Sequence, residues 1–81
     1  MPVSPPPFAV GRNWRAGVSD NKRHGGRVWK DRDNGFEYEP DPRRARGTWH
    51  EMNPRTGEYR DVDPDTGKPV AGREGQWRPL K

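Results

Sequence analysis

The sequence contains no cysteine, few hydrophobic residues and no long hydrophobic run. Without cysteine, the chain has neither a disulfide framework nor a cysteine-based zinc site. No apolar run approaches the ~20 residues that a membrane helix needs, and the first residues lack the charged and then apolar pattern of a signal peptide. Hydrophobic residues make up 26% of the 81 residues and charged residues 35%. We therefore expect one small domain with a thin core and no membrane span.

Aromatic residues and turn signals are what the sequence does contain. Four Trp, two Tyr and two Phe can each bury a large area. The phrases NPRTG (53–57) and DPDTG (63–67) place Asn or Asp before Pro and end in Gly, which predicts two hairpin turns with a glycine in the left-handed region. The segments between such turn signals are short, aromatic or β-branched, and lack helical spacing of apolar residues.

The fold class predicted from this pattern is mainly β. We expect a small, twisted antiparallel meander of about five or six short strands over residues 27–81. An irregular, basic arm over residues 1–26 precedes it, because its prolines favour extended backbone and its glycines leave no room for a long helix. If residues 53–57 form the hairpin loop, Met52 lies opposite Glu58 and His50 lies opposite Arg60.

Positive charge is concentrated at the start of the chain. Residues 1–30 carry a net charge of +5, whereas residues 31–81 carry −1. A basic arm with interspersed aromatic residues is typical of proteins that contact phosphate backbones. The predicted contacts of this arm include Lys22 and Arg23. A solvated arm, or one that binds an acidic protein, is the alternative.

Two histidines are the only side chains that titrate near neutral pH without a perturbed pKa. His50 lies in the middle of a predicted strand beside Glu51, whereas His24 lies in a glycine-rich segment. We therefore expect His50 to be the residue that carries acid–base chemistry. The alternative is a half-buried strand histidine with no reaction to perform.

An arginine-rich loop precedes the strand that contains His50. Its arginines are Arg43, Arg44 and Arg46. A guanidinium matches phosphate oxygens and stabilises the charge of a phosphoryl transition state, so this loop is a predicted phosphate site. The alternative is a solvated loop whose arginines pair with Asp41 or Glu39.

The motifs FEYEPD, RGTWHEM, GEYRDV and DPDTGKPV together resemble the ribosome-inactivating colicins and the related C-terminal toxin tips of bacterial polymorphic and contact-dependent inhibition systems. The resemblance covers roughly residues 27–72. It implies a metal-independent ribonuclease, without a cofactor, that cuts ribosomal RNA in the decoding centre and is inhibited by a cognate immunity protein. Arg46 stands where the family has a histidine, and His50 where it has a strand glutamate, so the catalytic roles are reassigned.

The resulting hypothesis is a toxin domain that cleaves RNA through attack of a ribose 2′-hydroxyl on the adjacent phosphorus. The predicted catalytic residues are His50, Glu51, Asp41, Arg46 and Arg60. The predicted RNA-binding residues are Arg43, Arg44, Tyr38, Tyr59, Arg78, Lys22 and Arg23. His50 or Glu51 is the expected base, Asp41 orients it or acts as the acid, and the arginines stabilise charge. No metal ligand is predicted.

We expect a monomer that is delivered from the producing bacterium into the cytoplasm of a target cell, where RNA, with the ribosome as one candidate, is its partner. The alternative is a non-catalytic β module that binds nucleic acid or protein through its arginines and aromatic residues.

Overall fold

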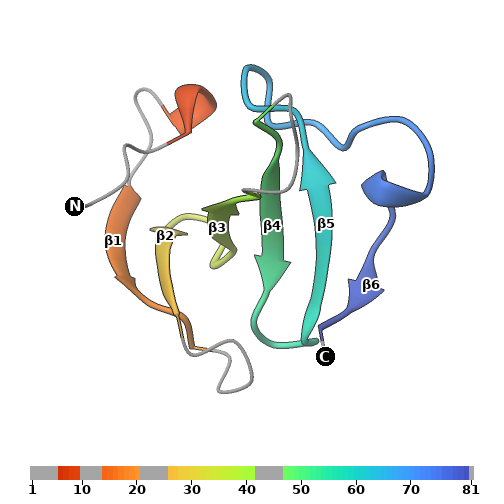
Figure 1. Ribbon diagram of the computed structural model, residues 1–81. Coiled ribbons are helices and arrows are strands. Elements are labelled where there is room, and N and C mark those ends of the chain that lie inside the picture. The colour runs from red at the N-terminus through yellow and green to blue at the C-terminus, as the bar shows by residue number, and fades with distance from the viewer. Residues whose placement is uncertain (1–5, 10–13, 21–25, 42–46, 81) are drawn as a thin grey trace.

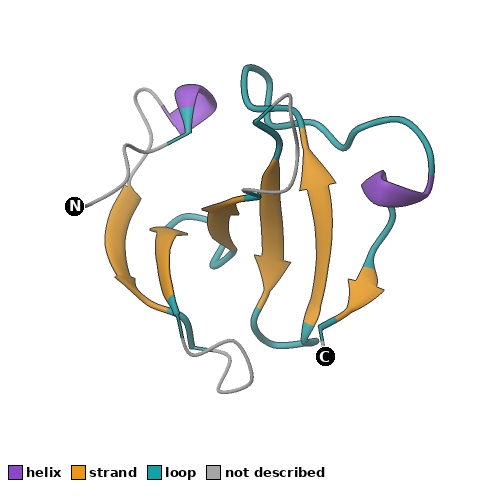
Figure 2. Cartoon of the chain, in the orientation of Figure 1, coloured by secondary structure: helices purple, strands orange, loops and turns teal. Residues whose placement is uncertain are grey.

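A single antiparallel sheet of six strands forms the protein in the computed structural model, which describes residues 6–9, 14–20, 26–41 and 47–80. The strands lie in the sheet in chain order (Figure 1). They are β1 (Trp14–Val18), β2 (Arg27–Asp31), β3 (Glu37–Pro40), β4 (Trp49–Asn53), β5 (Glu58–Val62) and β6 (Arg78–Pro79). The helical content of the described ranges is two short 3-10 helices, η1 (Pro7–Ala9) and η2 (Arg73–Gly75) (Figure 2). The predicted mainly β meander is confirmed. No helix in these ranges is long and apolar enough to cross a membrane.

Strand β1 lies within the segment that the sequence predicted to be loop, and that prediction is wrong for residues 14–18. The strand pairs with β2 from Trp14 opposite Asp31 to Val18 opposite Arg27. Local propensity disfavours a strand here because Gly17 contributes no side chain to pack. Pairing with β2 supplies the hydrogen bonds that this segment could not form alone.

Three turns of the meander have the same construction. They span Asp31–Gly35, Asn53–Gly57 and Asp63–Gly67. In each, the glycine N–H donates to the backbone carbonyl of the first residue, at 2.8, 2.9 and 2.8 Å. The first side chain accepts from the N–H two residues on, at 2.9, 3.0 and 2.7 Å. Each glycine has a φ of 75° to 79°, which explains why glycine ends the phrase. The predicted turns at 53–57 and 63–67 are confirmed.

The register between β4 and β5 differs by one residue from the prediction. Asn53 is the last residue of β4 and lies opposite Glu58, so the loop begins at residue 54. Asn53 pairs through its backbone while its side chain closes the turn, which is why a five-residue loop was the wrong choice. As a consequence, His50 lies opposite Asp61, and Glu51 lies opposite Arg60.

The two faces of the sheet differ in chemistry, because directly opposite residues share a face and neighbours along a strand alternate. One face, here the aromatic face, carries Trp14, Trp29, Tyr38, Trp49, Glu51, Arg60 and Val62. The other, the polar face, carries Val28, Glu37, Glu39, His50, Met52, Tyr59, Asp61 and Arg78. The core centres on Tyr38, Trp49 and Val62 of the aromatic face. The polar face is also largely covered, since Val28, Glu37, Met52, His50 and Asp61 are buried, whereas Glu39, Tyr59 and Arg78 are partly exposed.

The described part of the N-terminal segment packs on the aromatic face. The Phe8 ring lies 5.6 Å from the Trp14 ring and 5.4 Å from the Tyr38 ring, both in edge-to-face geometry. Pro6 is fully buried. Residues 6–9 therefore belong to the folded domain.

Replacing Gly67 by alanine is expected to cost more stability than replacing Gly35, although both have a positive φ of similar size. The left-handed backbone costs alanine about 1–2 kcal/mol at either position. A Cβ at Gly67 would lie 2.8 Å from Phe8 Cδ2, whereas a Cβ at Gly35 meets nothing within 4 Å. Overpacking adds about 1–3 kcal/mol at Gly67. Urea denaturation of the two variants measures the difference, and equal losses would contradict the packing of Phe8 on this turn.

Candidate functional site

A histidine surrounded by carboxylates occupies the polar face. Strand β4 carries His50, and the flanking strands place Glu39 on one side of it and Asp61 on the other. Asp41 follows β3 directly, and its N–H donates to the Thr48 carbonyl at 3.0 Å. Three adjacent strands therefore bring these side chains together, and we call Glu39, Asp41, His50 and Asp61 the His50 cluster.

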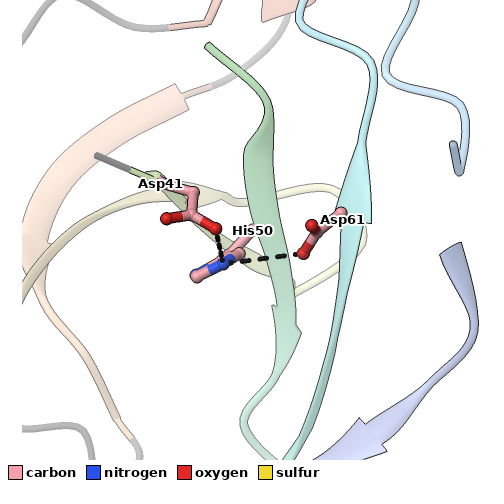
Figure 3. A group of neighbouring side chains, drawn as sticks. All are labelled: Asp41, His50 and Asp61. Carbon is pink, nitrogen blue, oxygen red and sulfur yellow. Dashed lines mark hydrogen bonds and ion pairs between the residues drawn. The ribbon is translucent and has the colours of Figure 1, made fainter. Parts of the chain in front are cut away.

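Both ring nitrogens of His50 face carboxylate oxygens. Nδ1 lies 3.1 Å from Glu39 Oε2, and Nε2 lies 3.0 Å from Asp41 Oδ2. Nε2 also lies 3.5 Å from Asp61 Oδ1, which comes from the neighbouring strand β5 (Figure 3). A neutral imidazole donates from only one nitrogen, whereas the protonated ring donates from both. The geometry of the cluster therefore suits the imidazolium form of His50.

Arg78 extends the cluster through Asp61. Its Nη2 donates to Asp61 Oδ1 at 3.1 Å and to the Glu74 carbonyl at 3.1 Å. Its guanidinium carbon lies 4.6 Å from the centre of the Tyr59 ring. The centres of the Tyr59 and His50 rings are 5.1 Å apart, in edge-to-face geometry. The Arg78 side chain is 34% exposed, so solvent reaches this cation beside the cluster.

Electrostatics favours a proton on His50. Burial lowers the pKa of His50, but the hydrogen bond with Glu39 and the negative charges of Asp41 and Asp61 outweigh burial. The net effect is a pKa above the ordinary value of 6.5. At neutral pH, a larger fraction of the folded protein is therefore protonated at His50 than for a free histidine.

The stability of the protein is expected to fall as the pH rises past 6.5, because of His50. The pKa of His50 is higher in the folded than in the unfolded chain, so the folded state binds the proton more tightly. This contribution is complete below the unfolded value and is lost as the pH rises through the folded value. Urea denaturation between pH 5 and 9 in a His24→Gln background measures it. Adding His50→Gln should remove this slope, and an unchanged slope would contradict the shift.

Two predicted catalytic residues lie on the aromatic face, away from His50. Arg60 Nε donates to Glu51 Oε1 at 2.6 Å, and the Tyr38 hydroxyl donates to Glu51 Oε2 at 2.5 Å. The Arg60 guanidinium also lies 4.3 Å from the centre of the Trp77 ring. These contacts join β3, β4 and β5 behind the cluster. They give Glu51 and Arg60 a role in holding the sheet.

The predicted RNA contacts are distributed differently. Tyr38 is 1% exposed, and its burial and its bond with Glu51 raise its pKa, so it lies in the core. Tyr59 is half-buried, between the His50 ring and the Arg78 guanidinium. Arg78 lies beside the cluster. Four predicted RNA contacts lie outside the described part of the chain, namely Lys22, Arg23, Arg43 and Arg44, and so does the predicted catalytic residue Arg46.

Sequence reasoning did not assign two members of the cluster, Glu39 and Asp61. Strand alternation carried a signal for Glu39, since Glu39 and Asp41 are two residues apart and belong on the same face. Asp61 was missed because the predicted register of β4 and β5 is off by one residue and places Arg60, instead of Asp61, opposite His50.

Asp41, His50 and Asp61 are also the described side chains that could hold a metal ion. Their ligand atoms lie within 4.8 Å of one another. A metal ion would have to replace the proton on Nε2 and compete with Arg78 for Asp61 Oδ1. These three residues could therefore serve either acid–base chemistry or metal binding, and treatment with EDTA distinguishes the two uses.

Comparisons with protein-family models, curated proteins and solved structures give no match for this chain.

Proposed function

We propose that this protein is a metal-independent endoribonuclease and the toxic domain of a bacterial delivery system. The observation that carries the proposal is the His50 cluster, in which one imidazole contacts carboxylates through both nitrogens and an arginine binds one of those carboxylates. Cleavage of RNA by its own 2′-hydroxyl needs a base, an acid and a cation for the phosphorane charge. The cluster and Arg78 supply all three.

In the proposed reaction, His50 acts as the acid. This role differs from the base predicted from the sequence, and the reason is the raised pKa of His50. The imidazolium gives a proton to the leaving 5′-oxygen, and a carboxylate of the cluster takes the proton of the 2′-hydroxyl. Asp41 and Asp61 hold the ring through Nε2. Arg78 stabilises the charge that develops on the phosphate.

RNA recognition is proposed to depend on the basic residues predicted from the sequence, which are Lys22, Arg23, Arg43, Arg44 and Arg46. Neutralisation of phosphates by such residues gives salt-dependent affinity. In agreement with the resemblance, we propose that the protein acts as a monomer on RNA in the cytoplasm of a target cell, with the ribosome as a candidate substrate. A cognate immunity protein inhibits it in the producing cell.

The test is incubation of the purified protein with intact ribosomes, and separately with a short RNA, in EDTA. We expect strand breaks that leave 2′,3′-cyclic phosphate and 5′-hydroxyl ends. The matched control is the same short RNA with 2′-deoxyribose at the cleaved position, which should remain intact. Cleavage that EDTA abolishes, or cleavage of the deoxy substrate, would contradict the proposed reaction.

A second candidate function, a nucleic-acid-binding module without activity, is favoured by the burial of the cluster. The exposed fractions of the side chains are 10% for His50, 4% for Asp41 and 2% for Asp61, and such an ion network can serve folding alone. A binding module would cut no RNA, and would lose affinity step by step as Arg43, Arg44 and Arg46 are replaced by glutamine. A catalytic domain instead has one residue whose loss stops turnover.

A further inference from the structure

The three carboxylates around His50 differ in their access to solvent. The side chain of Glu39 is 25% exposed, whereas those of Asp41 and Asp61 are 4% and 2% exposed. Glu39 contacts Nδ1, and the two aspartates contact Nε2. The cluster thus has a buried side at Nε2 and a more exposed side at Nδ1.

The difference in exposure between the two sides of the His50 ring is typical of a catalytic histidine. One ring nitrogen is held by buried carboxylates, which set its orientation, and the other nitrogen faces the reacting atoms. Here Asp41 holds Nε2 at 3.0 Å. Asp61 is itself bound by Arg78. Of the three carboxylates, Glu39 is therefore the one most exposed to solvent.

We propose that Glu39 is the catalytic base of the RNA cleavage reaction and that His50 Nδ1 is the acid; this inference rests on the proposed function. The Glu39 carboxylate takes the proton of the 2′-hydroxyl. The 2′-oxygen forms a bond to phosphorus as the bond from phosphorus to the 5′-oxygen breaks. The Nδ1 proton of His50 passes to the departing 5′-oxygen. The products are a 2′,3′-cyclic phosphate and a 5′-hydroxyl.

The contact between Glu39 and His50 also restores the site after each reaction. When the products form, Glu39 holds the proton from the 2′-hydroxyl and His50 is neutral. The two groups are 3.1 Å apart in the absence of substrate, so the proton passes from Glu39 Oε2 to Nδ1 through one hydrogen bond. This transfer returns the site to its starting protonation state.

The decisive experiment compares an ordinary RNA with the same RNA that carries sulfur in place of the leaving 5′-oxygen. A thiolate leaves without help from an acid, so loss of the acid matters only for the oxygen substrate, whereas loss of the base matters for both. We expect Glu39→Gln to lower the rate about 10²- to 10⁴-fold on both substrates. His50→Gln should be slow on the oxygen substrate and recover on the sulfur substrate. Glu58→Gln, which removes a partly exposed carboxylate from β5, is the matched control and should cleave at the wild-type rate.

A measurement that requires no cleavage accompanies it. NMR titration of the His50 ring should give a lower pKa in Glu39→Gln than in the wild type, because the carboxylate at Nδ1 is removed. An unchanged pKa of His50 in Glu39→Gln would overturn the inference. A Glu39→Gln variant that cuts RNA at the wild-type rate would also overturn it. So would a Glu39→Gln variant that is slow on the oxygen substrate but regains its rate on the sulfur substrate, because that result would make Glu39 part of the acid and not the base. In those cases the wild type still cleaves and the proposed function stands. A wild-type protein that cuts no RNA would overturn both.

Discussion

Replacing His50 by glutamine is expected to lower the rate of RNA cleavage by about 10²- to 10⁴-fold, the usual contribution of a positioned acid or base. The physical reason is the loss of the proton that the imidazolium gives to the leaving oxygen. The measurement is single-turnover cleavage of a short RNA in EDTA. His24→Gln removes the only other histidine and is the matched control, with a rate expected close to that of the wild type.

Loss of the histidine also leaves buried carboxylates without their cation, so folding of the variant must be separated from chemistry. Near-ultraviolet circular dichroism tests whether the His50→Gln variant is folded, and RNA affinity tests whether it still binds substrate. The pH dependence of the wild-type rate gives an independent reading, because an acid must be protonated. The rate should fall as the pH rises through the raised pKa of His50. A rate that instead rises through that pKa would assign His50 as the base, one of the two bases that the sequence predicts.

Replacing Tyr38 by alanine is expected to cost about 3–5 kcal/mol of unfolding free energy, the range for loss of a large aromatic side chain from a core. Tyr38 is 1% exposed, and its ring lies 4.6 Å from Trp14 and 5.4 Å from Phe8. A domain of this length has only roughly 4–12 kcal/mol in total. Much of the Tyr38→Ala protein should therefore be unfolded at 37 °C, as measured by urea or thermal denaturation.

Tyr38→Phe is the matched control, because it keeps the ring and removes only the hydroxyl that donates to Glu51. Its cost should be about 1–3 kcal/mol, the penalty for leaving a buried acceptor without its donor. If Tyr38→Ala and Tyr38→Phe were equally destabilised, the hydrogen bond to Glu51 rather than the aromatic packing would dominate the core.

The sequence predicted the turns and most of the strands because their signals are local. Asn or Asp followed by Pro, with Gly four residues after the first position, specifies a turn whose geometry depends on those residues alone. The sequence does not predict strand β1, because this strand is stabilised by pairing with β2 and by ring contacts of Trp14 with Phe8 and Tyr38. Such contacts depend on residues distant in the sequence.

The site was predicted in part. His50 and Asp41 were selected from residue type and local context, and the structure brings them together. Glu51 was included because it is adjacent in sequence, although neighbours along a strand point to opposite faces. Glu39 depends on the pairing of β3 with β4, and Asp61 on the exact register of β5, which a one-residue difference at Asn53 was enough to obscure.

The order of strands in the sheet has a kinetic consequence. Each strand pairs with its neighbour along the chain, from β1 to β6, so no pairing has to bring the two ends of the chain together, and a smaller mean sequence separation of contacts favours faster folding. The same topology offers little mechanical resistance, since tension on either end can peel off one strand at a time instead of shearing the whole sheet. Under tension, a chain built in this way is expected to lengthen one strand at a time, from the edge strands β1 and β6 inward.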